Sequence, residues 1–177
     1  MTGDTPFILL GESFSGPLAL RLASDQPAGL IAVVLVASFV RTPAPSWLRW
    51  LPWGALFYFR TPLYILRALM TGSQDAAEIL RRTSRLIRNV HPSVLADRVR
   101  SILTVDARTW LRSCPVPILY LSGSQDRLVR RHCFNQILTC RHDVVQHTVQ
   151  TPHFVLQLAP AEAWAAISQF VAEHCHL

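Results

Sequence analysis

Two apolar segments near the start of the chain constrain its fold more than any other feature. The first is FILLG at residues 7–11, and the second is LIAVVLVASFV at residues 30–40. Between them, residues 14–24 place leucine and alanine at spacings that suit a tightly packed helix, and the turn-forming residues at 25–29 end it. A strand that is buried on both faces has a continuous apolar sequence. The order strand, helix, strand therefore predicts a βαβ unit with parallel strands and a right-handed crossover.

Beyond residue 41 the sequence predicts an insertion and then the rest of the sheet. The insertion, at about 41–104, begins with a segment rich in aromatic residues and proline and continues with two helix-like segments, at 73–89 and from 92 onward. A third buried strand is expected at 116–123 and a helix at 130–140. A fourth strand at 143–150, a loop at 151–160 and a closing amphipathic helix at 161–173 follow. We expect an α/β fold: a mostly parallel sheet of about four strands with flanking helices and a helical cap, all within one domain, residues 1–177.

Composition narrows the classes of partner. Half of the 177 residues are apolar, which suits a folded core. The chain has no lysine, so its 17 lysine-plus-arginine positions are all arginine, and the net charge is +6. The densest run of arginines falls between apolar positions at helical spacing, which indicates a solvated helix face, and no nucleic-acid-binding motif accompanies it. We expect no nucleic-acid partner.

Neither export nor a membrane anchor is indicated. The N-terminus carries Asp4 and no basic segment of the kind that begins a signal peptide. The longest uncharged apolar run, at residues 29–40, is too short to cross a bilayer. The four cysteines form no C-x-x-C pair and require no disulfide. The sequence therefore predicts a cytoplasmic location.

A serine stands between the first apolar run and the first helix. Ser13 has Gly11 two residues before it and Gly16 three residues after it. Small neighbours allow a strand and a helix to approach across a sharp turn, which would lift the serine hydroxyl above the sheet at the helix N-terminus. Negative charge that develops there is stabilised by the helix dipole. From this segment alone a simpler interpretation stays open, in which Ser13 caps the helix.

Two later strand ends offer the groups that would activate a serine hydroxyl. Asp126 follows the strand at 116–123 in a glycine-containing loop, and His153 follows the strand at 143–150. The carboxyl ends of parallel strands assemble the sites of such sheets. A serine nucleophile needs a base, and the base needs an orienting acid. The chain order Ser13, Asp126, His153 is the order expected for one particular fold.

Other residues compete for these roles. Asp106 opens a predicted short helix, where a capping role fits better. The rival histidines begin a helix or lie in or beside a strand, where a structural or solvated role fits better; they are His132, His142 and His147. Cys140 with His142 and His147 has no spacing known for a metal site, so we expect no metal ligand and no cofactor.

These segments resemble the α/β-hydrolase superfamily over nearly all of the chain. LLGESFSG is similar to its nucleophile elbow, SGSQDRLV to its acid loop, and TPHFVLQLAPAEAWAAISQFV to its histidine loop and last helix. The resemblance implies that Ser13 is the nucleophile, His153 the general base and acid, and Asp126 the orienting acid. It also implies that the backbone N–H of Phe14 forms half of the oxyanion hole. One position departs from the pattern, because Ser15 stands where the family has glycine.

The same resemblance implies that the front of the fold is absent. Members of the superfamily have several strands and a helix before the elbow, and a loop in that part supplies the second oxyanion donor. Here only six residues precede the first strand. Three explanations stay open: the true start lies further upstream, the chain is a fragment, or it is a homologue truncated at its N-terminus. In each case the segment at residues 7–11 is expected to offer an unpaired apolar edge that is prone to self-association.

The resemblance implies a serine hydrolase of hydrophobic carboxylic esters that works through an acyl-enzyme. Large apolar side chains in the cap suit acyl chains, and we select Trp47, Trp50 and Phe57 as candidate substrate contacts. The alternative for the cap aromatics, which include Phe59 and Tyr64, is packing against the sheet; membrane contact is not favoured. Two other functions stay open: a non-catalytic homologue that acts through association, and a non-hydrolytic reaction of the same triad.

Overall fold

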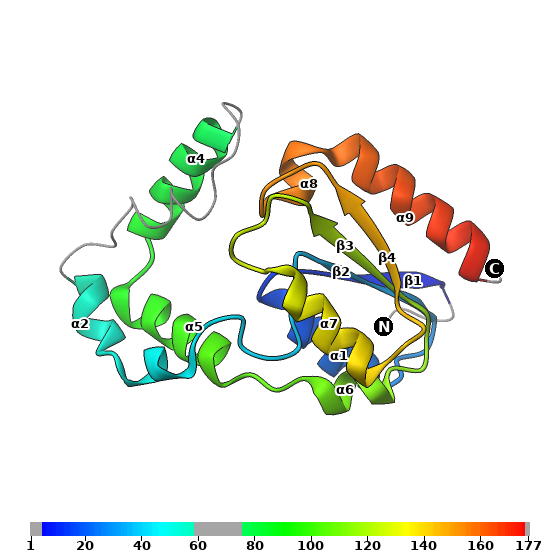
Figure 1. Ribbon diagram of the computed structural model, residues 1–177, viewed down its shortest axis with the longest axis horizontal. Helices are drawn as coiled ribbons and strands as arrows, with labels where there is room; N and C mark the ends of the chain where they lie inside the picture. The colour runs from blue at the N-terminus through cyan, green and yellow to red at the C-terminus, as the bar shows by residue number, and fades with distance from the viewer. Residues whose placement is uncertain (1–4, 59–75, 176–177) are drawn as a thin grey trace.

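Four parallel strands form the centre of the computed structural model, which describes residues 5–58 and 76–175 (Figure 1). The strands are β1 (Phe7–Glu12), β2 (Leu30–Val36), β3 (Ile118–Gly123) and β4 (Val145–Val149). Their order in the sheet is β1-β2-β3-β4, so neighbours in space are also successive strands in the chain. The α/β fold class and the four-stranded parallel sheet expected from the sequence are confirmed.

Helices cover both faces of this sheet. On one face lie α1 (Ser15–Ser24), α6 (Arg108–Ser113) and α7 (Arg131–Cys140), and on the other lie α8 (Val155–Leu158) and α9 (Pro160–His174), as Figure 1 shows. Successive side chains of a strand point to opposite faces. Leu35 and Tyr120 therefore join the cluster under α1 and α7, while Val36 and Leu121 join the cluster under α9.

The described part of the insertion is helical. It contains η1 (Ser46–Trp50), α2 (Trp53–Tyr58), α4 (Ala76–Arg88) and α5 (Pro92–Thr104). Both η1 and α2 pack against α5, and the end of α5 reaches the sheet domain, where Ile102 packs on a small cluster formed by Phe39, Val129 and Cys133. Figure 1 shows α2 and α4 projecting to one side of the sheet. The first residues of the helix expected at 73–89, and the cap residues Phe59 and Tyr64, lie outside the described residues.

Three sequence expectations need correction. β1 was expected to be buried on both faces, yet only Gly11 in it is buried and Leu10 is 45% exposed. The reason is that, among the described residues, β1 pairs with β2 alone, so that one edge of the strand is open. β2 ends at Val36 rather than at residue 40, because Ala37 turns the backbone with a φ of 43°. The segment expected as a loop at 151–160 contains the short helix α8.

Within the described residues, no helix combines the length and the apolar character needed to cross a bilayer.

Helix α1 offers a matched test of the core. Leu20 is fully buried in the cluster under α1, whereas Leu22, on the same helix, is 55% exposed. We expect Leu20→Ala to lower the free energy of unfolding by about 2–5 kcal/mol, because it removes buried methyl groups and leaves a cavity. Leu22→Ala should change it by less than about 0.5 kcal/mol. Urea unfolding followed by circular dichroism measures both, and equal losses would contradict this packing.

Candidate active site

Ser13 lies in the sharp turn that joins β1 to α1. Its backbone φ is 52°, in the left-handed region that residues with a side chain seldom adopt. Its N–H donates to the carbonyl of Val36 at 2.8 Å, which extends the pairing of β1 with β2 by one residue beyond Glu12. Helix α1 begins two residues later, at Ser15. The turn thus leaves Ser13 at the N-terminal end of a helix, as the sequence predicts.

Close packing in this turn explains its small residues. A Cβ atom added to Gly11 would lie 2.7 Å from the Cα of Gly16 and 2.8 Å from the carbonyl oxygen of Ser15. Both distances are far inside ordinary contact, so the strand and the helix can approach only with glycine there. Ser15, the departure from the family pattern, is accommodated because its hydroxyl donates back to the carbonyl of Glu12 at 2.8 Å.

The three residues singled out from the sequence lie in one hydrogen-bonded line. The Nε2 atom of His153 is 3.0 Å from the Oγ of Ser13, although the two residues are 140 positions apart in the chain. The Nδ1 atom of His153 is 2.8 Å from the Oδ2 of Asp126. The side chains of His153 and Asp126 are only 7% and 2% exposed. The line is therefore shielded from water on its histidine and aspartate side.

Asp126 is fixed by its own loop. Its Oδ1 accepts hydrogen bonds from the backbone N–H groups of Leu128 and Val129, at 2.8 and 2.9 Å. Oδ2 is left for the histidine, so the carboxylate has one defined orientation. Since a carboxylate only accepts, the Nδ1 of His153 donates to it, and Nε2 is then an acceptor for the Ser13 hydroxyl. This tautomer is the one in which the imidazole can take a proton from the serine.

The rivals for these roles lie in other surroundings. Asp106 accepts from the guanidinium and the backbone N–H of Arg108, and the Arg108 hydrogen bonds lower its pKa to about 2. The Nε2 of His132 lies 3.4 Å from the Cys133 thiol, and the Nε2 of His147 lies 3.9 Å from the Oε1 of Glu162. His142 is exposed. None of these four residues contacts Ser13 in the described part of the chain.

The remaining candidates are the backbone N–H of Phe14 and three aromatic residues of the cap. Phe14 is the N-cap of α1, so its backbone N–H lies at the positive end of the helix beside Ser13. In the cap, Trp47 and Trp50 are 61% and 77% exposed, and Phe57 packs against Trp53 with ring centroids 6.0 Å apart. Among the described residues, neither tryptophan nor Phe57 has a hydrogen bond or ring contact with Ser13, Asp126 or His153. Their role in substrate binding stays a prediction.

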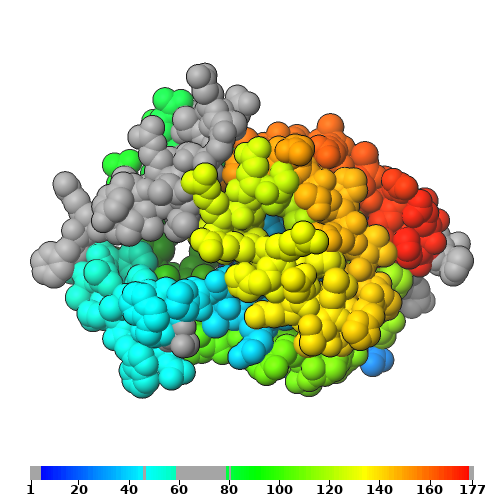
Figure 2. Space-filling model, viewed as in Figure 1, coloured from blue at the N-terminus to red at the C-terminus, as the bar shows by residue number. Residues whose placement is uncertain are grey.

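A cavity of about 410 Å³ lies beside the Asp126 loop. It is lined by the ends of β3 and β4 and by the start of α7, with Ser122, Ser124, Thr148 and Arg130 among its polar side chains. Figure 2 shows the surface hollowed between the segment that follows β3 and the orange segment around α8. Neither Ser13 nor His153 lines this cavity, so it is distinct from the space in front of the serine hydroxyl.

Three supporting residues escape prediction from the sequence. Ser38 and Tyr120 form a buried hydrogen-bonded connection behind the Ser13 turn, and Gln157 in α8 donates to the Oε2 of Glu12 at 2.9 Å. Each of these contacts joins segments that are distant in the chain. The sequence offers one local indication for Ser38: it comes just after an apolar strand. This position places a polar group beside the carboxyl ends of the strands, where Ser13 also lies.

Solved structures share this fold. A hydrolase from Pseudomonas aeruginosa superposes with a TM-score of 0.77 at 16% identity, over 95% of this chain and 65% of the other. A thermophilic esterase from Thermogutta terrifontis gives a TM-score of 0.76 at 16% identity, over 96% of this chain and 65% of the other. The parallel sheet, the turn at Ser13 and these neighbours define an α/β-hydrolase fold.

The family follows from the sequence match. Residues 1–153 match the family model described as serine aminopeptidase, S33. The chain therefore belongs to this family of the α/β-hydrolase superfamily, as the resemblance implies.

Two curated relatives have nearly the same sequence identity to this chain. Pimeloyl-[acyl-carrier protein] methyl ester esterases from Neisseria meningitidis serogroup A and serogroup C are 29% and 28% identical to the chain, each over 93% of it. The chain spans 56% of the length of the first relative and 68% of the second.

Glycine variants test the packing of the turn. Gly11→Ala should lower the free energy of unfolding by roughly 1–3 kcal/mol, because the added Cβ forces β1 and α1 apart. Gly54→Ala is the matched control: it lies in α2 with no atom within 4 Å of the added Cβ, so it should be neutral or stabilising by up to about 1 kcal/mol. Chemical denaturation measures both. An unfolding free energy for Gly11→Ala that equals wild type would refute the close approach described here.

Proposed function

We propose that the protein is a serine hydrolase that cleaves hydrophobic carboxylic esters through an acyl-enzyme. The observation that carries this proposal is the hydrogen-bonded line from the carboxylate of Asp126 through His153 to the hydroxyl of Ser13, with contacts of 2.8 and 3.0 Å. Membership of an α/β-hydrolase family and similarity to proteins named as esterases support it. In this proposal Ser13 is the nucleophile, His153 the base and then the acid, and Asp126 the orienting acid.

The reaction follows from the tautomer of His153. The Ser13 Oγ attacks the ester carbonyl carbon while its proton passes to Nε2 of His153, and Asp126 stabilises the resulting imidazolium. The bond to the alcohol oxygen then breaks, and the alcohol leaves with the proton from Nε2. Water, deprotonated by the same nitrogen, attacks the acyl-enzyme and releases the carboxylic acid with Ser13 regenerated. The backbone N–H of Phe14 would donate to the oxyanion, aided by the positive end of α1.

Covalent labelling tests the nucleophile. We expect a fluorophosphonate probe to modify wild-type protein at Ser13, located by peptide mass spectrometry, and to leave Ser13→Ala unlabelled. Hydrolysis of p-nitrophenyl butyrate should fall by at least about 10³-fold in Ser13→Ala, because the covalent route is lost. Ser24→Ala, at the half-buried last residue of α1, controls for removal of a serine. A folded wild-type protein with neither labelling nor turnover would refute the proposal and favour the alternative of a non-catalytic homologue that acts through association.

Paired variants test the other two roles. His153→Gln and Asp126→Asn should each lower kcat by about 10³-fold or more, because the first removes the base and the second favours the wrong histidine tautomer. The matched controls are His142→Gln, at an exposed histidine, and Asp143→Asn, at a surface carboxylate paired with Arg141. Both controls should keep wild-type turnover. Equal activity of a site variant and its control would remove that residue from the proposed mechanism.

A finer proposal concerns what carries the acyl group. The curated relatives are named for a methyl ester on an acyl-carrier protein. Helix α4 exposes four arginines, Arg81, Arg82, Arg85 and Arg88. A basic helix face is complementary to an acidic protein surface and speeds encounter with it. We therefore favour esters presented by an acidic carrier protein, with α4 as the surface that the carrier contacts.

Charge reversal on α4 separates carrier-borne from free esters. Arg85→Glu should raise the KM for a methyl ester of a carrier-bound acyl group by roughly tenfold at low salt, and added salt should shrink the difference. Turnover of p-nitrophenyl butyrate should not change. Arg112→Glu, at an exposed arginine of α6, makes the same change in net charge away from α4 and should affect neither substrate. Equal losses on both substrates would argue against a carrier-docking role.

A further inference from the structure

Two neighbouring strand ends carry unusual backbone conformations. Ser13, after β1, has a φ of 52°, and Ala37, after β2, has a φ of 43°. A residue with a Cβ atom adopts this region at an energetic cost, and it stays there only when the surrounding contacts leave no alternative. The contacts that hold these two residues bear on the candidate site, because Ser13 carries the hydroxyl that faces His153 and Ala37 immediately precedes Ser38.

Ser38 holds the carbonyl of Ser13. The Ser38 side chain is buried, with the residue 1% exposed, and its Oγ donates to the Ser13 carbonyl oxygen at 2.8 Å. The same oxygen accepts the N–H of Gly16 at 3.2 Å, and the N–H of Ser13 donates to Val36. The peptide groups on both sides of the strained residue are thus fixed. Rotation of Ser13 toward an ordinary φ would break the partly buried hydrogen bond from Ser38.

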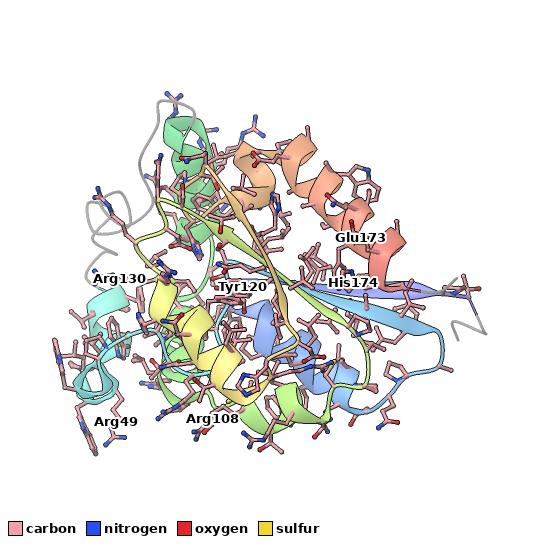
Figure 3. All side chains as sticks on the ribbon, turned by 45° about the vertical axis from the view of Figure 1, so that its right-hand side comes forward. Arg49, Arg108, Tyr120, Arg130, Glu173 and His174 are labelled. Carbon is pink, nitrogen blue, oxygen red and sulfur yellow. The ribbon has the colours of Figure 1, made fainter. Side chains whose placement is uncertain are left out.

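Tyr120 holds Ser38 in turn. Its hydroxyl donates to the Ser38 carbonyl at 2.8 Å, and its ring stacks on Phe134 of α7 with centroids 4.9 Å apart. Tyr120 is 1% exposed, and burial raises the pKa of its hydroxyl far above its usual range, so this group stays a donor. Figure 3 shows Tyr120 at the centre of the molecule, between the sheet and α7. The N–H of Ala37 also donates to Leu121, in the same strand as Tyr120.

We propose that Ser38 is a positioning residue for Ser13, anchored by Tyr120, and that this buried connection keeps the Ser13 hydroxyl aligned with His153. The inference rests on the proposed serine hydrolase function and adds a residue that does not touch the substrate. It runs across three strands, from β3 through the end of β2 to the end of β1. The shape of the turn fits it: a Cβ atom at Gly16 would lie 1.8 Å from the Ser38 Oγ, so glycine there makes room for this hydroxyl.

The test measures how fast Ser13 reacts in each folded molecule. Ser38→Ala should lower the second-order rate constant for fluorophosphonate labelling of Ser13 by about tenfold, because a misplaced nucleophile loses near-attack geometry. The kcat for p-nitrophenyl butyrate, per labelled site, should fall by the same factor with KM unchanged. Tyr120→Phe keeps the ring and removes only the anchoring hydroxyl, and it should lower both rates in the same direction. The double variant should lose no more rate than the worse of the two single variants, because the residues act in one connection; losses that add in free energy would mean that they act independently.

Controls separate positioning from stability. Ser122→Ala removes a hydroxyl from β3 that bonds to Thr148 and does not reach the turn, so its labelling rate should match wild type. If Ser38 served stability alone, Ser38→Ala would lower the melting temperature while its folded fraction labelled at the wild-type rate. That result, shared by Tyr120→Phe, would overturn the inference and leave the hydrolase proposal standing. If Ser38→Ala does not fold, Tyr120→Phe decides the question. Absence of labelling in wild type would overturn the hydrolase proposal, and this inference with it.

Discussion

Parallel pairing of the four strands is the constraint on which the candidate site depends. In a parallel sheet the carboxyl ends of all strands point to one edge, and the loops that leave those ends meet there. Glu12 at the end of β1 lies opposite Val36 at the end of β2, which lies opposite Leu121 in β3; Gly123 at the end of β3 lies opposite Val149 at the end of β4. Ser13, Asp126 and His153 each follow within a few residues of such an end. The three residues therefore come together because of the register in which the strands pair. The apolar side chains on both faces of the sheet fix that register.

The register brings the segments together, but it does not set the direction of each side chain. That direction comes from a second layer of contacts, different for each of the three residues. The carbonyl of Ser13 accepts two hydrogen bonds, which keep this residue at its positive φ. The carboxylate of Asp126 accepts hydrogen bonds from two N–H groups of its own loop. The loop that carries His153 is continued by α8, whose Gln157 bonds to Glu12 beside the serine. In the proposed reaction, an aligned hydroxyl, imidazole and carboxylate would need no reorganisation.

The sequence predicts those parts of the structure that short-range patterns encode. Apolar runs locate the first three strands, β-branched residues locate the fourth, and the small residues around Ser13 indicate a tight turn. Asp126 and His153 could be singled out because they follow strand ends in the required order. Ser38 and Tyr120 could not, because their contact joins positions 82 residues apart and depends on which strands become neighbours. The half-exposed state of β1 and the four-residue helix α8 were missed for related reasons: strand burial depends on the pairing partner, and so short a helix has no periodicity to detect.

The role of the cap in substrate binding is less well defined by contacts than the line of Ser13, His153 and Asp126. Its aromatic side chains suit a pocket for an apolar acyl group, yet Trp47 and Trp50 are largely exposed, and Arg49 lies over the Trp50 ring at 5.0 Å. Side chains that line an enclosed apolar pocket would instead be buried from solvent. The apolar composition of the cap is therefore compatible with substrate binding without locating it, whereas the line from Asp126 to Ser13 rests on direct contacts. The proposed reaction chemistry consequently rests on direct side-chain contacts, whereas the proposed identity of the ester does not.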